Sequence, residues 1–358
     1  MNFGDRKYVP TLAIRPSEMN ALEFLPGATK DRMTPCILLA PWANSNTLER
    51  AIDRVERAFP NRNYFLDIDR DYRFTNLESA PQQELTHLMD PANGFANWVD
   101  FVEQHVWVWP CVQTRDQNEA DLRQQIAAFQ ELERPYFMRI VRDRFPGNID
   151  EIISAFSAGG TADFAIILEG GWTTDPLSLS VWFQGILSES LQAIDASVPI
   201  ILSCTSMPKI FTRYEGITPV PFNNRQLVEQ ISRSSNRTTI IYGDWGSTRP
   251  REHSGFANRP WDRIDYPTSS AWYIVRNKNE EWDFETAAKK LVERDDIWDG
   301  NLNIWGEEMI FQTTINEEIG IDTAPKNVAA RVNIHLHRQA FFDYPEIHSI
   351  DFDEDWED

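Results

Sequence analysis

The sequence predicts a closed (β/α)8 barrel of the TIM type, and two observations carry this prediction. Eight short apolar runs, rich in Val, Ile, Leu and aromatic residues, recur along the first two-thirds of the chain, and a helix-like stretch follows each run. Such runs are typical of strands that are buried on both faces. Right-handed crossovers through the intervening helices close eight parallel strands into a barrel. The predicted strands are 8–14, 36–40, 64–68, 106–112, 136–141, 164–168, 199–203 and 239–242.

The helices expected between these strands follow in order along the chain. In the stretch 46–59 the apolar residues Leu48, Ile52, Val55 and Phe59 recur at helical spacing. After the third strand comes a polar insertion, 69–94, of the length that often forms a lid or a specificity element. The predicted helices are 17–25, 46–59, 95–104, 117–132, 148–156, 177–194 and 224–234.

The sequence as a whole predicts three regions. They are a barrel core at 1–245, an elaboration that packs on the barrel at 246–344, and an acidic tail at 345–358. In the elaboration we expect a loop over 246–267, a short strand at 270–276 and helices at 284–294, 305–315 and 326–342. This extension is rich in tryptophan, which indicates an apolar surface that something covers, such as the contact of a homo-oligomer. The tryptophans are Trp261, Trp272, Trp282, Trp298 and Trp305.

The chain is strongly acidic, with a formal net charge of −21. Six of the acidic residues lie in the last eight positions, but the rest of the chain is acidic without them. An acidic body repels phosphate backbones, which argues against general binding of nucleic acids or of anionic membranes. No apolar run approaches the roughly 20 residues that span a bilayer, and the N-terminus carries no signal sequence. We therefore expect a cytoplasmic protein.

Ionisable residues follow several of the predicted strands, where a barrel places its active site. Asp67, Asp69, Glu169 and Asp244 come from three strands, so we expect them to meet at the barrel mouth. Such a group could hold Mg²⁺ or another divalent ion, or act as an acid/base pair. Equally, these acids could form ion pairs in a solvated mouth with arginines such as Arg15, Arg70 and Arg139.

The loops after the last two strands, SCTSMP at 203–208 and GDWGS at 243–247, are rich in hydroxyl groups and glycine. Barrels often bind phosphate through backbone N–H groups of these loops, which makes Ser206, Gly243 and Trp245 candidate ligand-binding residues. The alternative is that Gly243 and Gly246 only permit tight turns.

The familiar sequence signatures of catalysis are missing. No serine-hydrolase elbow, Walker loop, zinc-protease helix or dinucleotide-binding motif occurs. His335 and His337 are two apart on a predicted helix, so they do not share a face, and we expect one to be buried and one solvated. The three cysteines lack metal or disulfide spacing and are expected to be small buried side chains.

A series of short motifs resembles one family. Residues 8–39 combine a YVP-type strand, a short helix with the pattern E-x-x-A-L and a second strand, and Arg139 lies in the fifth strand. Glu169 stands where the family has Asp. SCTSMP resembles S-S-F-P, RYE at 213–215 resembles R-x-E, YGDWGS resembles YGDYGS, AWYIVRN resembles W-x-V-R-G, WGEEMI resembles G-D-x-x-I, and VNIHLH resembles a helix with histidine near the C-terminus. In this order, over roughly 7–340, the motifs resemble the beta family proteins of phages and bacteria.

The resemblance implies a barrel fold and an association with phage–host conflict and anti-phage defence. It brings no catalytic mechanism. The longer acids at 169 and 307, Glu in place of Asp, argue against a strict metal geometry. The positions that the resemblance marks as candidate site residues are Arg139, Glu169, Ser206, Arg213, Glu215, Asp244, Trp272, Arg276, Glu307 and His335.

Three functions fit these features. The first is a component of a defence-type system, a barrel that binds a small anionic ligand such as phosphate, or a protein partner through the acidic tail. The second is a metal-assisted hydrolase or lyase acting on a phosphorylated small molecule or nucleotide. The third is an acidic mimic of nucleic acid. The sequence leaves open whether the chain is an enzyme.

Two sets of candidate residues follow from this reading, and neither is assigned as a set of metal ligands. The candidate catalytic residues are Asp67, Arg139, Glu169 and Asp244. The candidate ligand-binding residues are Arg15, Ser206, Arg213, Glu215, Gly243, Trp245, Trp272, Arg276, Glu307 and His335.

Overall fold

The computed structural model describes residues 7–158, 163–251 and 261–344, and the acidic tail from residue 345 lies outside this range. The chain divides into two compact units, each built from separate stretches of sequence. The barrel unit takes its described residues from Met1–Ile14, Thr34–Ser206 and Asn223–His253. The second unit takes its described residues from Arg15–Met33, Met207–Phe222 and Ser254–Asp358.

The barrel unit contains eight parallel strands in the order β4-β3-β2-β1-β9-β7-β6-β5. A parallel bridge between Cys111 and Phe137 joins the two outermost strands, β4 and β5, and nearly closes the sheet into a barrel. The predicted (β/α)8 fold is confirmed, because each strand lies where an apolar run predicts one. The strands are β1 (Tyr8–Ala13), β2 (Cys36–Leu39), β3 (Tyr64–Ile68), β4 (Val108–Pro110), β5 (Tyr136–Val141), β6 (Phe164–Trp172), β7 (Ile200–Thr205) and β9 (Ile240–Asp244).

Alternate residues of the strands fill the barrel interior, as the period of two along a strand requires. One buried cluster joins side chains from the different strands, among them Phe65, Phe137, Ile167, Ile201 and Ile241. Their neighbours in sequence therefore point outward to the helices. This alternation decides which residues near the strand ends face the mouth.

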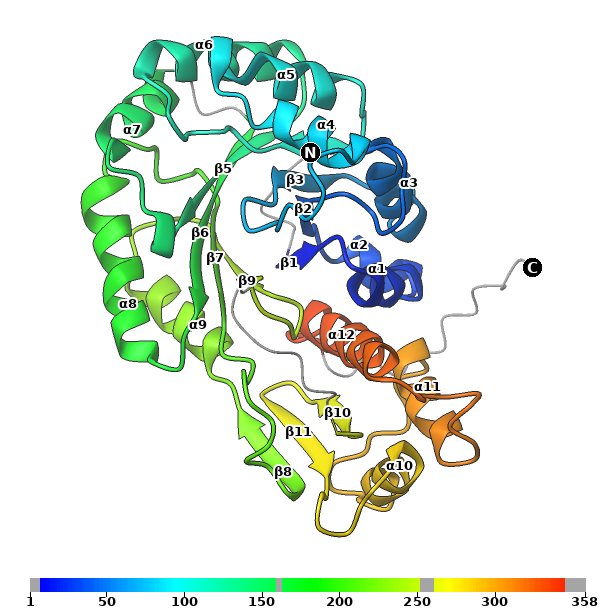
Figure 1. Ribbon diagram of the computed structural model, residues 1–358. Coiled ribbons are helices and arrows are strands. Elements are labelled where there is room, and N and C mark those ends of the chain that lie inside the picture. The colour runs from blue at the N-terminus through cyan, green and yellow to red at the C-terminus, as the bar shows by residue number, and fades with distance from the viewer. Residues whose placement is uncertain (1–6, 159–162, 252–260, 345–358) are drawn as a thin grey trace. The chain divides into compact units, whose positions relative to one another are not determined.

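Helices cover the outside of the barrel, and Figure 1 shows α7, α8 and α9 outside β5, β6 and β7. Helix α4 lies inside the polar insertion 69–94, which the sequence does not predict as a helix. Two of the helices begin at capping side chains, Asn118 for α6 and Asp175 for α8. The helices are α3 (Glu49–Ala58), α4 (Ala80–Leu88), α5 (Ala92–Glu103), α6 (Glu119–Glu131), α7 (Ile149–Ala158), α8 (Pro176–Gly185) with a π-helical turn at Ile186–Ser190, and α9 (Asn224–Ser234).

In its described residues the second unit combines an antiparallel sheet, in the order β10-β11-β8, with five helices. The helices predicted after residue 280 are present. Strand β10 corrects the expectation of a loop over 246–267, and β8 is not predicted by the sequence. The strands are β8 (Gly216–Pro221), β10 (Ile264–Pro267) and β11 (Ala271–Arg276); the helices are α1 (Pro16–Glu23), α2 (Gly27–Asp31), α10 (Phe284–Val292), α11 (Trp305–Thr313) and α12 (Ala324–Ala340).

Helix α12 runs through the middle of the second unit, against α1, α11 and β10. Because neighbours cover it on several sides, His335 and His337 are both buried, at 1% exposure each. The expectation that one of them is solvated is therefore wrong. The ring of His337 has a polar partner, since its Nδ1 lies 2.8 Å from the Thr29 hydroxyl.

No helix in the described part of the chain has the length and apolar character that crossing a lipid bilayer requires.

Candidate functional site

Three of the predicted site residues meet at the carboxyl ends of the barrel strands. Asp67 on β3, Arg139 on β5 and Glu169 on β6 each lie two residues beyond an interior residue of the same strand, so they continue the rows that face the interior. Arg139 lies between the two acids. Its Nη1 donates to Asp67 Oδ2 at 3.1 Å, and its Nη2 lies 3.8 Å from Glu169 Oε2.

The Glu169 carboxylate is held by hydrogen-bond donors on both oxygens. Oε1 accepts from the Gly171 N–H at 2.8 Å and from the Trp245 indole N–H at 2.9 Å, and Oε2 accepts from the Ser203 hydroxyl at 3.0 Å. The Gly171 bond depends on an irregularity in the pairing of β6 with β7, where Gly171 has a φ of +67°. Strand irregularities of this kind often occur at binding sites.

Asp67 is held in a similar way from β4. The Gln113 amide donates to Asp67 Oδ1 at 2.9 Å, and the Ile68 N–H donates to the same oxygen. Gln113 in turn accepts from Arg70 Nη2 at 2.8 Å. A chain of polar contacts therefore leads from the rim of the mouth at Arg70 to the buried Arg139.

Burial and charge act on Arg139 in opposite directions. Desolvation alone would lower the pKa of Arg139, but the nearby carboxylates of Asp67 and Glu169 outweigh it and raise the pKa. The guanidinium is therefore always charged. Burial raises the pKa of Glu169, although Arg139 and the donors from Trp245, Gly171 and Ser203 favour its ionised form.

The guanidinium of Arg139 nevertheless does not donate all of its N–H groups to hydrogen bonds within the described residues. Its side chain is 4% exposed. Among the residues that the structure describes, its buried Nε–H has no hydrogen-bond partner, and Glu169 is too far from Nη2 for a hydrogen bond. Nε and Nη2 form one edge of the planar guanidinium, the edge that binds carboxylate or phosphate with two parallel hydrogen bonds. Within the described residues, this edge of the buried cation therefore makes an ion pair with Glu169 but donates no hydrogen bond.

Asp244 does not join this group. It follows the outward-facing Tyr242 by two residues, so its position alternates with the interior residues Ile241 and Trp245. Asp244 Oδ1 accepts from the Tyr8 hydroxyl at 2.5 Å and Oδ2 from the Tyr242 hydroxyl at 2.9 Å. Burial, together with the charge of Asp244, raises the pKa of both tyrosines. The structure thus places Asp244 in a tyrosine network in the barrel wall.

The loop residues predicted to bind phosphate have different environments. A Cβ at Gly243 would lie 2.8 Å from the Val9 carbonyl oxygen and 3.0 Å from Ile201, so glycine allows β9 to approach its neighbours. The Trp245 side chain points inward, and its indole N–H donates to Glu169. The Arg139 guanidinium lies over the indole, with its Cζ 5.9 Å from the ring centroid. The buried Ser206 hydroxyl has no hydrogen-bond partner within the described residues.

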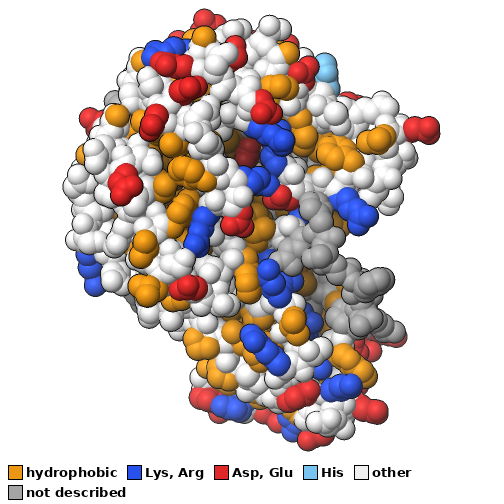
Figure 2. Space-filling view, turned by 60° about the vertical axis from the view of Figure 1, so that its left-hand side comes forward, with side chains coloured by type: hydrophobic (Ala, Val, Ile, Leu, Met, Phe, Trp, Pro, Cys, Tyr) orange, Lys and Arg blue, Asp and Glu red, His pale blue; other side chains and the backbone are white. Residues whose placement is uncertain are grey.

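Other arginines and acids of the mouth pair with one another. Arg251 contacts Asp69 at 2.5 Å, and Arg144 contacts Asp71. Figure 2 shows basic side chains beside acidic ones around a hollow on the face that it presents. The described residues contain no group of three or more His, Cys, Asp or Glu side chains arranged to hold a metal ion.

The other predicted site residues belong to the second unit, where they form several separate contacts. Arg276 lies 3.8 Å from Glu215, and Arg213 donates to the Tyr214 hydroxyl at 2.7 Å. Trp272 and His335 pack around Phe222. Glu307 accepts from the Tyr266 hydroxyl at 3.0 Å, and Arg15 pairs with Glu18 at the start of α1.

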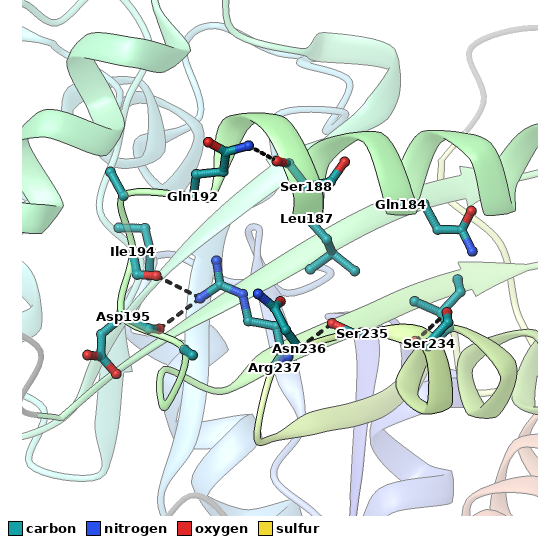
Figure 3. Close-up of a pocket in the computed structure, with 13 residues that line it drawn as sticks. Gln184, Leu187, Ser188, Gln192, Ile194, Asp195, Ser234, Ser235, Asn236 and Arg237 are labelled. Carbon is teal, nitrogen blue, oxygen red and sulfur yellow. Dashed lines mark hydrogen bonds between the residues drawn. The ribbon is translucent and has the colours of Figure 1, made fainter.

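A pocket of about 760 Å³ opens at the other end of the barrel unit, beside the amino ends of β7 and β9. Figure 3 shows Arg237 in its centre, where Nη1 donates to the carbonyls of Ile194 and Asp195. Nη2 donates to the Leu191 carbonyl as well. This buried arginine is engaged by backbone groups, in contrast to Arg139.

Comparison with known proteins places the chain in a family. A family model described as "Beta protein" matches residues 8–341. The chain belongs to the Beta protein family. It is 27% identical over 372 aligned positions to "Protein beta" of Enterobacteria phage P4, across 99% of this chain and 98% of that protein.

The positions that resemble Beta protein motifs divide between the two units. Arg139, Glu169, Ser206 and Asp244 lie in the barrel unit, and the other six lie in the second unit. Sequence reasoning missed four residues that hold the barrel carboxylates: Tyr8, Gln113, Ser203 and Tyr242. For Gln113 and Ser203 a signal existed, because both continue an interior row of their strands.

Proposed function

We propose that the barrel mouth of this Beta protein family member binds a small anionic ligand, with Arg139 as the anchoring cation, and that it does so in phage–host conflict. The observation that carries the proposal is the Nε–Nη2 edge of the buried Arg139, which donates no hydrogen bond within the described residues. A carboxylate or phosphate group offers two oxygens with the spacing of that edge. The same chemistry accommodates the phosphate of a nucleotide or of a phosphorylated metabolite.

Two further arginines of the mouth favour an anion. Arg70 donates to the uncharged Gln113, and Arg142, which follows β5, donates to the uncharged Ser178 hydroxyl at 2.7 Å. Neither hydrogen bond neutralises the positive charge. A ligand that enters past Arg70 would therefore meet a positive side chain before it reaches Arg139.

Acid–base or metal chemistry is less well supported by the same contacts. Glu169 accepts three hydrogen bonds, and Asp67 accepts two besides its bond from Arg139. Asp244, the third acid of the metal-assisted alternative, binds two tyrosines instead. Carboxylates that are held in this way have few free lone pairs for a metal ion or for proton transfer.

The role in phage–host conflict rests on the family. The relative named "Protein beta" comes from a phage, and its similarity extends over nearly the whole of both chains. A defence-type component could bind a ligand at the mouth and a protein partner through the acidic tail, which lies outside the described residues. The mimicry of nucleic acid has weaker support, since several acids of the mouth form ion pairs with arginines.

The experiment is a thermal-shift titration with inorganic phosphate, AMP and ADP, on the full chain and on Arg139→Lys. A ligand at 100 times its Kd adds about 2.7 kcal/mol of stability. We expect at least one anion to raise the melting temperature of the wild type, and Arg139→Lys to lose the effect because lysine lacks the two-donor edge.

The matched control is Arg237→Lys, which alters a second buried guanidinium at the opposite end of the same unit. It should keep the ligand response. Equal responses in Arg139→Lys and Arg237→Lys, or no response to any anion in a folded wild type, would refute an anion site at Arg139. For the biological role, plaque counts on cells that express the wild type or Arg139→Lys should differ.

A further inference from the structure

The second unit contains a pocket of about 500 Å³ at the amino end of α11. Its size is within the range of pockets that bind small molecules. Aromatic side chains and two carboxylates line it, and none of its described lining residues is basic. The side chains that matter here are Trp298, Trp305, Phe311, Glu307 and Glu308.

The two indoles of the pocket are held in place by neighbours of the same unit. Trp298 packs on Tyr266, with ring centroids 5.3 Å apart, and Trp305 stacks on Phe24 at 5.0 Å with an interplanar angle of 18°. Gly300 has a φ of +71°, and a Cβ there would lie 2.9 Å from the Trp298 Nε1. Glycine at this position therefore lets the indole lie against the backbone.

The carboxylates lie at different depths. Glu307 is 4% exposed and accepts hydrogen bonds from the Leu302 N–H at 2.8 Å and the Tyr266 hydroxyl at 3.0 Å. Glu308, one residue on, is exposed. The nearby Arg338 is engaged by Asp299 and by the Tyr266 hydroxyl, at 3.2 and 2.8 Å. Burial raises the pKa of Glu307, so a cation nearby would favour its ionised form.

We propose that this pocket binds a small organic cation, an ammonium or guanidinium group on a short alkyl chain. Indole faces attract cations, most strongly where water is excluded, and they also pack against the alkyl chain. The exposed carboxylate of Glu308 supplies the opposite charge, and the buried Glu307 adds negative potential behind it. This site is separate from the anion site proposed at the barrel mouth, and neither proposal depends on the other.

The test is calorimetric titration of the full chain with agmatine, with the neutral 1-pentanol as the comparison ligand. Agmatine should bind, and 1-pentanol should bind at least roughly tenfold more weakly, because it lacks the charge. Glu308→Gln should weaken agmatine binding about fivefold, as the loss of one partly exposed ion pair would. Trp305→Leu should weaken it about tenfold or more.

The controls change the same residue types outside the pocket lining. Glu318→Gln, at an exposed position, and Trp282→Leu, at a half-buried one, should leave the affinity for agmatine unchanged. Equal affinities in Glu308→Gln and Glu318→Gln would overturn the proposal, as would equal binding of 1-pentanol. Binding of an Arg-containing peptide but not of agmatine would overturn it too, in favour of a protein partner. If Trp305→Leu does not fold, the comparison of Glu308→Gln with Glu318→Gln still tests the proposal.

Discussion

At the scale of single residues, Arg139 is the one cation between two buried acids. Replacing it by methionine would leave Asp67 and Glu169 buried without an opposite charge. We expect Arg139→Met to lower the free energy of unfolding by about 3–5 kcal/mol in a urea titration. Adding Asp67→Asn and Glu169→Gln should recover much of this loss, because the uncompensated charges are then gone.

The control for this series is Arg115→Met, which removes an exposed arginine that contacts Asp116. Its effect should stay within about 0.5 kcal/mol. If Arg139→Met is as mild as Arg115→Met, the two carboxylates do not depend on the guanidinium.

A second residue, His105, gives the barrel unit a dependence on pH. Burial lowers the pKa of His105 below its ordinary 6.5, while Glu49 and Asp53 oppose this and Arg134 adds to it. The unfolded chain therefore takes up a proton at a higher pH than the folded one does. The stability that the neutral ring contributes is present above pH 6.5 and is lost as the pH falls.

We expect the free energy of unfolding of the wild type to fall between pH 7.5 and pH 5 by more than that of His105→Phe, measured by urea titration at each pH. Phenylalanine keeps the ring contact with Phe101 and does not titrate. His87→Gln, which changes an exposed histidine, should behave as the wild type does. Parallel pH profiles for wild type and His105→Phe would contradict this assignment.

The residue scale also marks how far the sequence can predict the site. Asp67, Arg139 and Glu169 could be predicted to share the mouth, since each lies two residues after an interior position of its strand and therefore faces the same side. The partners of Asp244 could not. Tyr8 lies 236 residues from it in sequence, and only the pairing of β1 with β9 brings the two together.

At the scale of elements, two glycines in helices have opposite surroundings. A Cβ at Gly306, in α11, would lie 2.6 Å from the Ala330 carbonyl oxygen of α12, whereas nothing lies within 4 Å of a Cβ at Gly185, at the end of α8. Gly306→Ala should therefore force α11 and α12 apart and cost about 1–3 kcal/mol. Gly185→Ala should instead gain up to about 1 kcal/mol, because alanine favours the helix.

Thermal unfolding of both variants checks this pair, and each serves as the control of the other. The explanation fails if Gly306→Ala is as stable as the wild type, since α11 would then have room for a methyl group against α12.

Strand β8 shows why one element could not be predicted from the sequence. It contains Pro219 and Pro221, and proline inside an apolar run argues against a strand. In the structure β8 is the edge of its sheet and pairs only with β11 within the described residues. The two prolines are two apart, so their missing N–H groups lie on the same side of the strand. The partner that allows this pattern lies some fifty residues later in sequence, at β11.

At the scale of the whole molecule, the two units are interleaved along the chain. The second unit includes Arg15–Met33 and Met207–Phe222, which precede most of it in sequence. Within that unit, the Asn333 side chain donates to the Ala21 carbonyl and α12 packs against α1. A fragment that ends at residue 253 therefore keeps α1 and β8 but loses their partners α12 and β11.

We expect this fragment, 1–253, to expose apolar surface and to bind a hydrophobic dye such as ANS, unlike the full chain. The change Met19→Ser with Leu22→Ser, at two buried positions of α1, should reduce the dye binding of the fragment. A fragment that unfolds cooperatively and binds no dye would show that α1 and β8 do not need the C-terminal part of their unit.

The positions of the cysteines allow opening of the barrel to be followed by thiol labelling, without an added probe. All three thiols are free and buried, and all three lie in the barrel unit, on β2, just after β4 and on β7. Burial raises the pKa of Cys36, Cys111 and Cys204, so a thiol reagent has no thiolate to attack until the barrel opens. The labelling rate of each cysteine therefore reports how often its own part of the barrel opens. The second unit carries no cysteine, so opening of that unit alone would not be detected by thiol labelling.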